Sequence, residues 1–152
     1  LSSGGLFRVD LTKCTGLGDE AIYSLLRHSG DTLLELSLNS VYPLSKTFFL
    51  LILIEESNPK KITMKKRHDK EHDEGANAEN TEKSKYFIET PLPLLTSLDV
   101  GFVRAVDDEV VDLIGTKCEK LKILEVFGNN RCTSTDKVRD GLLVIGRQSD
   151  TL

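Results

Sequence analysis

The sequence predicts an α/β fold, a solenoid built from short strands that alternate with helices. Four stretches place apolar residues, or a Cys or Asn at the last two positions, at offsets 0, +3, +5, +8 and +11 from a leucine. The four sets are Leu6, Val9, Leu11, Cys14 and Leu17; Leu33, Leu36, Leu38, Val41 and Leu44; Leu95, Leu98, Val100, Val103 and Val106; and Leu121, Leu124, Val126, Asn129 and Cys132. This spacing is typical of the leucine-rich repeat, whose units stack and display a surface for partners. We therefore expect about four repeats in a right-handed β-α superhelix, closed by a C-terminal cap.

A second repeated pattern predicts the helices. Pairs of apolar residues stand at +16 and +19 from three of the starting leucines: Ile22 and Leu25, Phe49 and Ile52, and Val111 and Ile114. Residues three apart share one face of a helix, so each pair is expected to point toward the strands. Asp19 and Asp108 both stand at +13, where a short acidic side chain can cap the N-terminus of a helix.

One segment interrupts the register of the repeats. Successive starting leucines are 27, 62 and 26 residues apart, and the 36 residues of segment 55–90 account for the long middle spacing. Seventeen of these 36 residues are charged, which leaves too little apolar surface to offset the cost of ordering the chain. We expect a disordered insertion, whose origin as a lineage-specific loop or as a gene-model error stays open.

The expected organisation is therefore two repeats in residues 1–54, the insertion in 55–90, two repeats in 91–132 and the cap in 133–152. Because the chain opens on Leu1 and within a repeat, we expect it to be the C-terminal piece of a longer protein.

The longest apolar run, Phe48 to Ile54, is seven residues, far below the roughly 20 that a bilayer span needs. Three cysteines, an odd number, argue against a disulfide scaffold and favour a reducing compartment.

The outward residues of the strands are the first candidates for function, because solenoids bind partners through such faces. At +4 the repeats carry Asp10, Ser37, Asp99 and Glu125, and carboxylates there would repel phosphate and attract a basic protein partner. We select as the candidate partner-binding set Asp10, Asn39, Asp99, Phe102, Glu125 and Phe127. The alternative is that these residues only solvate the face. No catalytic residue is assigned, because the carboxylates lack a neighbouring histidine, nucleophile or enclosed pocket.

Basic residues give two further hypotheses. The first is direct contact with DNA or phosphate near the C-terminal edge, through Arg131, Lys137, Arg139 and Arg147. The second is a nuclear-import cluster in the insertion, formed by Lys60, Lys61, Lys65, Lys66 and Arg67. A charged, solvated linker is the alternative for that cluster and for the histidine pair His68 and His72. The net charge of −4 gives no basic footprint over the whole chain, and we expect neither a metal nor a cofactor.

Two sets of motifs carry a resemblance to known families. The stretches LTKCTGLGDEAI and CEKLKIL resemble the cysteine-containing leucine-rich repeats of F-box proteins. The more specific stretches EVFGNNRCT and GLLVIGRQSDTL resemble the C-terminus of the fungal DNA-repair proteins of the RAD seven type, and the resemblance covers residues 6–54 and 91–152. The residues that carry it are Asn129, Asn130, Arg131, Cys132, Gly146, Arg147 and Gln148.

This resemblance implies a non-enzymatic, nuclear scaffold protein of global-genome nucleotide-excision repair. In that family the partners are a Snf2-type ATPase with a RING domain and an elongin-C-like adaptor, which together form a cullin-type ubiquitin ligase. The insertion at residues 55–90 departs from the family pattern, and the N-terminal part that would carry adaptor binding is absent. The cysteine-type repeats alone suggest an alternative, the substrate-receptor region of an SCF F-box ubiquitin ligase in protein turnover.

Overall fold

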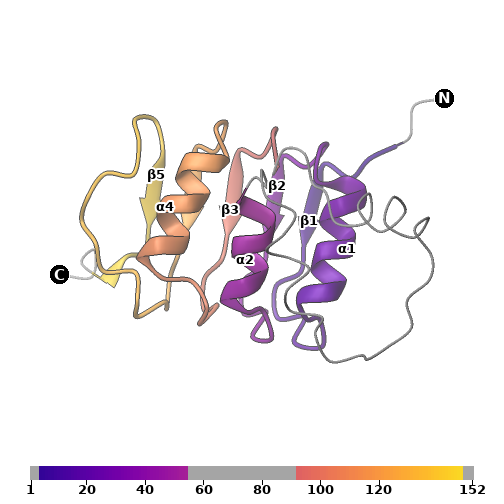
Figure 1. Ribbon diagram of the computed structural model, residues 1–152, viewed down its shortest axis with the longest axis horizontal. Coiled ribbons are helices and arrows are strands. Elements are labelled where there is room, and N and C mark those ends of the chain that lie inside the picture. The colour runs from indigo at the N-terminus through magenta and orange to yellow at the C-terminus, as the bar shows by residue number, and fades with distance from the viewer. Residues whose placement is uncertain (1–3, 55–91, 149–152) are drawn as a thin grey trace, which may run out of the picture. The chain divides into compact units, whose positions relative to one another are not determined.

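The computed structural model describes residues 4–54 and 92–148, which belong to one compact unit (Figure 1). In these residues five parallel strands form one sheet, in the order in which they occur along the chain. The strands are β1 (Arg8–Asp10), β2 (Glu35–Ser37), β3 (Ser97–Asp99), β4 (Ile123–Glu125) and β5 (Leu143–Ile145). The helices α1 (Asp19–Ser29), α2 (Lys46–Leu53) and α4 (Asp108–Lys117) cover one face of this sheet. The leucine-rich repeat fold is thereby confirmed.

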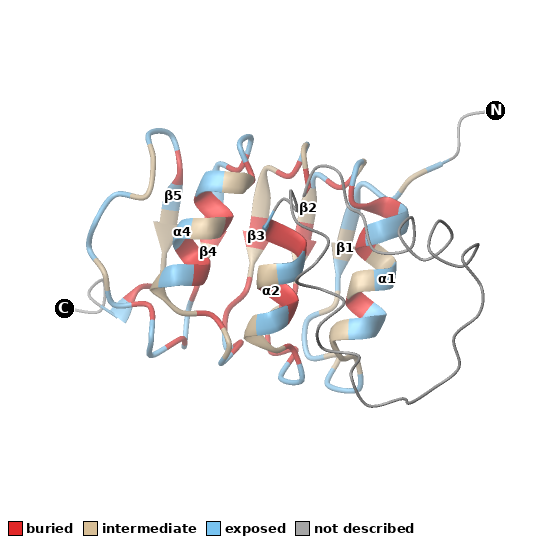
Figure 2. Ribbon diagram, in the orientation of Figure 1, coloured by how far each residue is buried: buried red, intermediate tan, exposed pale blue. Residues whose placement is uncertain are grey.

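The strands pair in the register that the leucine offsets predict. The central residue of each strand pairs with the central residue of the next, so Leu36 stands between Val9 and Leu98, and Leu98 stands beside Leu124. The side chains of Leu36, Leu98 and Leu124 are buried under the helices, where buried residues concentrate (Figure 2). Successive residues of a strand point to opposite faces, so the residues that flank each centre lie on the face that the helices leave open.

The first repeat departs from the predicted burial. Leu6 is 45% exposed, whereas the starting leucines of the next repeats, Leu33 and Leu95, are fully buried. The difference arises because β1 lies at the end of the described sheet and has a paired strand on one side only. In α1 the inward residue is Leu26, and the predicted Leu25 is half-buried. The other predicted helix residues are buried as expected: Ile22, Phe49, Ile52, Val111 and Ile114.

The prediction that Asp19 and Asp108 cap their helices is wrong. The N-cap of α1 is Gly18, which makes no side-chain cap, and the N-cap of α4 is Asp107, whose carboxylate accepts from Val110 N at 3.0 Å. Both predicted residues lie one position inside the helix and bind the next repeat instead. The Asp19 carboxylate accepts from the Ser45 amide at 2.8 Å and from its hydroxyl.

The same contact recurs between the later repeats and forms what we call the inter-repeat ladder. Lys46 Nζ lies 2.7 Å from the carboxylate of Asp107, and Asp108 accepts from the amide and hydroxyl of Thr133 at 3.0 and 3.1 Å. In each case the side chain at +13 of one repeat binds the residue at +12 of the next. Hydrogen bonds to Asp107 and Glu109 raise the pKa of Lys46. Burial raises the pKa of Asp107, but hydrogen bonds from Lys46 and Val110 N and the nearby positive charges together lower it below its ordinary value.

The predicted cap contains a strand that the sequence analysis did not anticipate, since β5 pairs with β4 in parallel. No helix connects these two strands in the described residues, and the connecting segment packs on α4 at Gly115. A Cβ at Gly115 would lie 2.2 Å from Val138, so glycine permits this close approach. None of the helices in the described ranges combines the length and apolar character that a bilayer span requires.

Replacement of Leu98 by alanine should lower the free energy of unfolding by roughly 2–5 kcal/mol, because Leu98 is 3% exposed and the cavity lies at the centre of the sheet. Urea denaturation measures this loss. Leu94→Ala is the matched control, since Leu94 is 37% exposed, and it should change stability by about 0.5 kcal/mol or less. Equal losses in the two variants would contradict the predicted placement of Leu98 in the core.

Replacement of Asp108 by alanine should lower the free energy of unfolding by about 1–2 kcal/mol, because the carboxylate accepts three hydrogen bonds from Thr133 and Ser134. The control is Asp112→Ala on the exposed side of α4, which should have little effect. A loss in α4 helicity without a loss of global stability would indicate a capping role and contradict the ladder.

Candidate functional site

The open face of the sheet carries two columns of outward residues. One column holds Arg8, Glu35, Ser97, Ile123 and Leu143, and the other holds Asp10, Ser37, Asp99, Glu125 and Ile145. The first column begins with an exposed ion pair between Arg8 and Glu35 at 2.6 Å and ends with apolar side chains. Ile123 is 39% exposed and Leu143 58% exposed, so the face changes from charged to apolar toward β5.

Asp10, at the charged end, belongs to a local hydrogen-bond network. Its carboxylate accepts from the Thr12 amide at 2.9 Å and from the Thr12 hydroxyl at 2.6 Å, and these bonds lower the pKa of Asp10. The Thr12 hydroxyl also lies 2.9 Å from the hydroxyl of Ser37 on the next repeat. These hydrogen bonds lie at the exposed surface, and those from Thr12 fix the Asp10 carboxylate within its own turn.

Asp99 and Asn39 lie together at the turn that follows the strands. The carboxylate of Asp99 accepts from the Gly101 amide at 2.9 Å and from Asn39 Nδ2 at 3.1 Å. A Cβ at Gly101 would lie 2.8 Å from Asn39 Nδ2 and 3.2 Å from the carbonyl oxygen of Phe127. Because Gly101 has no side chain, the Asn39 amide, the Asp99 carboxylate and the turn at Phe127 can all approach it closely.

Glu125 stands directly beside Asp99 in the parallel register of β3 and β4. Burial raises the pKa of Glu125, and the negative charge and hydrogen bond of Asp99 raise it further. Two carboxylates on neighbouring strands repel each other when both are ionised, and a cation placed over them would relieve that repulsion. The pair therefore favours a positively charged group on a partner over a phosphate.

Two aromatic rings in the turns that follow β3 and β4 are exposed, as the sequence predicted. Phe102 is 50% exposed and Phe127 is 45% exposed. Each ring lies on a glycine of the following turn: a Cβ at Gly128 would be 2.3 Å from the Phe102 ring, and one at Gly146 would be 2.6 Å from the Phe127 ring. The backbones of the two phenylalanines are joined by a hydrogen bond of 2.7 Å from Phe102 N to Phe127 O.

The turn position of Phe102 is conformationally special in every repeat. At +7 the backbone enters the left-handed region, with φ of 63° at Lys13, 59° at Ser40, 56° at Phe102 and 72° at Gly128. Only the fourth repeat uses glycine, which adopts this conformation at no steric cost. For a bulky residue the conformation costs about 1–2 kcal/mol, so Phe102 holds its exposed ring in a strained backbone.

Ile123, Leu143 and Ile145 belong to this face and were missed by the sequence analysis. The segment Leu142–Ile145 is apolar and is followed by Gly146, a pattern that could have predicted a strand. The leucine offsets stop after Cys132, so the sequence predicts only a C-terminal cap there. The apolar end of the face is therefore a finding of the structure.

Two of the four residues predicted to contact phosphate have structural roles instead. The Arg139 guanidinium donates to the carbonyls of Gly115 and Cys118 at 3.1 Å, of Glu119 at 3.0 Å, and of Leu121, at and beyond the C-terminal end of α4. Arg147 is 8% exposed and donates to the carbonyls of Ser134 and Asp136 at 2.7 and 2.8 Å. Backbone carbonyls of the same chain thus bind both guanidinium groups.

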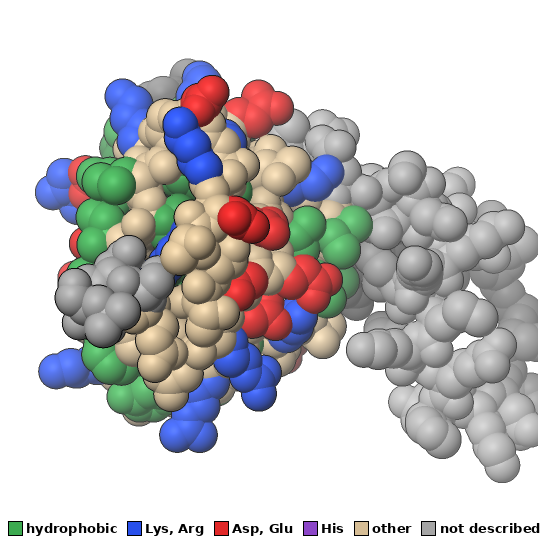
Figure 3. Space-filling view, turned by 90° about the vertical axis from the view of Figure 1, so that its left-hand side faces the viewer, with side chains coloured by type: hydrophobic (Ala, Val, Ile, Leu, Met, Phe, Trp, Pro, Cys, Tyr) green, Lys and Arg blue, Asp and Glu red, His purple; other side chains and the backbone are tan. Residues whose placement is uncertain are grey.

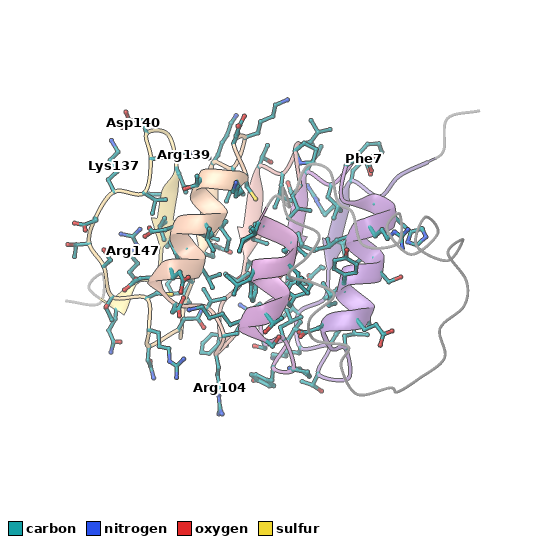
Figure 4. All side chains as sticks on the ribbon, viewed as in Figure 1. Phe7, Arg104, Lys137, Arg139, Asp140 and Arg147 are labelled. Carbon is teal, nitrogen blue, oxygen red and sulfur yellow. The ribbon has the colours of Figure 1, made fainter. Side chains whose placement is uncertain are left out.

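The other two residues of this predicted set, Lys137 and Arg131, are both exposed. Lys137 pairs with Asp140 at 2.6 Å, and the labelled Arg104 projects away from the ribbon (Figure 4). Seen from the end that carries β5, Lys and Arg side chains are scattered over the margins while hydrophobic side chains gather at the left (Figure 3). The cluster Lys60, Lys61, Lys65, Lys66 and Arg67 lies outside the described residues.

Two of the cysteines, Cys118 and Cys132, are buried and have structural roles. Burial raises the pKa of Cys118 and of Cys132 to about 12, so neither thiol is ionised at neutral pH. Cys132 Sγ lies 3.6 Å from the Val106 carbonyl, and Asn129 Nδ2 donates to the Val100 carbonyl at 2.8 Å. Gln148 N donates to the Cys132 carbonyl at 3.1 Å. Residues of the motif that resembles the repair proteins thus bind backbone groups near the β5 end of the sheet, which gives the motif a structural role.

Comparison with known proteins gives relatives over almost the whole chain, although no protein-family model matches it. The chain is 32% identical over 148 residues to the DNA repair protein RAD7 of Saccharomyces cerevisiae and 27% identical over 144 residues to the DNA repair protein rhp7 of Schizosaccharomyces pombe. These matches cover 97% and 95% of the chain but only 20% and 19% of the relatives, so the chain spans about a fifth of their length.

A solved structure agrees with these matches. The crystal structure of the Rad7 and Elc1 complex in yeast contains a chain that is 33% identical, with a TM-score of 0.59. The match covers 90% of the chain described above and 25% of the chain in the complex. The protein is therefore homologous to a part of the DNA repair proteins RAD7 and rhp7, over nearly the whole of the sequence given.

Proposed function

We propose that this protein acts as a non-enzymatic interaction scaffold in global-genome nucleotide-excision repair. The observation that carries the proposal is the match to RAD7 and rhp7 over more than nine tenths of the chain. The scaffold role is supported by an open sheet face with exposed aromatic and apolar residues, a surface on which solenoids bind other proteins. A role in DNA repair also makes the nucleus the proposed location.

The proposed partners follow from the same relatives. The structural neighbour is a complex of Rad7 with Elc1, and we propose that the intact protein binds an elongin-C-like adaptor and a Snf2-type ATPase with a RING domain. Through the adaptor it would belong to a cullin-type ubiquitin ligase that participates in recognition of damaged DNA. The relatives are about five times longer than the matched region, so adaptor binding need not lie within the described residues.

The charge of the open face favours a protein over DNA as the direct ligand. Asp99 and Glu125 lie side by side on the face, and Arg139 and Arg147 are bound to backbone carbonyls. A protein that binds duplex DNA strongly needs several exposed cations on one surface to replace the counterions of the phosphates. We propose that any role of this region at damaged DNA is mediated by its protein partners.

A chimera tests this function in a cell. The region of Saccharomyces cerevisiae RAD7 that matches this chain is replaced by residues 1–152, and survival after ultraviolet irradiation is measured in a strain that lacks RAD7. We expect the chimera to restore survival, because the sequence and the fold are similar to those of the replaced region. The control is the same chimera with Leu98→Ala and Leu124→Ala, which should not restore it. Normal protein levels without any restored survival would contradict the proposed function.

A further inference from the structure

The open face ends in a surface that we call the aromatic–carboxylate surface, formed by Asp99, Phe102, Glu125 and Phe127. It belongs to the turns and strands of two consecutive repeats, β3 and β4. Gly101 joins its parts, because a Cβ there would lie 3.1 Å from Asp99 Oδ1 and 3.2 Å from the Phe127 carbonyl oxygen. Two carboxylates and two half-exposed rings thus occur together in one small area.

The rings are held in place before any partner binds. Phe102 lies on Gly128 and Phe127 lies on Gly146, and both glycines have a positive φ, 72° and 86°. A side chain at either glycine would displace the ring. Rigid aromatic groups lose little conformational entropy on binding, so a fixed pair of rings suits recognition better than flexible side chains would.

The exposed ring of Phe102 points to a role outside the fold, because the left-handed backbone at its position is common to all four repeats and does not require an aromatic residue. The equivalent turn uses Gly128 in the fourth repeat, which is the residue that this left-handed conformation favours. Phe102 adopts the strained conformation and leaves half of its side chain exposed, so the ring is not required to fill the core. Such a residue is better explained by contact with a partner than by stability.

The carboxylates define the charge of the partner. No Lys or Arg of the described residues forms an ion pair with Asp99 or Glu125. Asp99 accepts from the neutral groups Asn39 Nδ2 and Gly101 N, and its other partner, Glu125, is itself a carboxyl group, so no cation of the described residues compensates the pair. Phosphate groups are repelled by this arrangement and cationic side chains are attracted to it.

We propose that the aromatic–carboxylate surface binds an arginine-bearing segment of a protein partner, with guanidinium groups stacked on Phe102 and Phe127 and paired with Asp99 and Glu125. Arginine is preferred to lysine because its planar group both stacks on aromatic rings and pairs with carboxylates through two hydrogen bonds. The apolar residues Ile123 and Leu143 extend the surface toward the partner's aliphatic side chains. The inference rests on the proposed scaffold function, to which it adds the chemistry of the ligand.

Fluorescence polarisation with the intact protein tests this inference. The probes are three labelled eight-residue peptides that alternate threonine with arginine, with lysine or with glutamate. We expect the arginine peptide to bind below 1 mM, the lysine peptide to bind several-fold more weakly, and the glutamate peptide not to bind. Phe102→Gly should weaken arginine-peptide binding at least tenfold and leave the thermal midpoint equal to or above that of the wild type, because glycine relieves the backbone strain.

Lys13→Gly is the matched control, since it relieves the same backbone strain in the first repeat, two repeats away from the surface, without removing an aromatic ring, and it should leave binding unchanged. Glu125→Gln, which keeps the shape of the side chain, should weaken binding through the lost charge. The inference is overturned if the arginine peptide does not bind at 1 mM, if all three peptides bind equally, or if Phe102→Gly binds as the wild type does. Restored survival by the RAD7 chimera together with such a result would remove this inference and leave the proposed function intact.

Discussion

The structure depends on the burial of one aliphatic residue per strand against its counterparts in the neighbouring strands. Leu36, Leu98 and Leu124 stand in one row beneath the helices, and their backbones pair in parallel. A shift of one residue would turn these side chains toward solvent and the polar ones inward, so the register is strongly specified. The two columns on the open face are positioned by this same row.

Polar contacts at the two ends of each unit reinforce that row. On the helix side, the inter-repeat ladder joins +13 of one repeat to +12 of the next through Asp19, Lys46 and Asp108. On the turn side, Gly101 and Gly128 let one repeat lie directly against its neighbour. The open face can therefore carry strained or repulsive groups, such as Phe102 and Glu125, because the core and the ladder hold the backbone independently of them.

Periodic features were predictable from the sequence, and features that depend on contacts between repeats were not. The leucine offsets predicted the sheet register, and the outward positions of Asp99, Glu125 and Phe127 followed from alternation along the strand. The sequence wrongly predicts Asp108 as a cap because the true cap, Asp107, is only one position away. The partner of Asp108 in the ladder, Thr133, lies 25 residues further along the chain, and the sequence does not reveal that contact. Arg139 and Arg147 look like surface cations in the sequence, and only the folded cap shows that backbone carbonyls surround them. β5 was missed because it has lost the leucine pattern.

The stacked strand–helix units act as one cooperative body that holds the open face rigid. Native-state amide hydrogen exchange tests this cooperativity most directly, because the amides of each strand donate to the preceding or following strand. Amides of β2, β3 and β4 should exchange slowly and with similar opening free energies, close to that of global unfolding. Rapid exchange of β3 and β4 while β2 remains protected would show that the repeats open separately, and would contradict the claim.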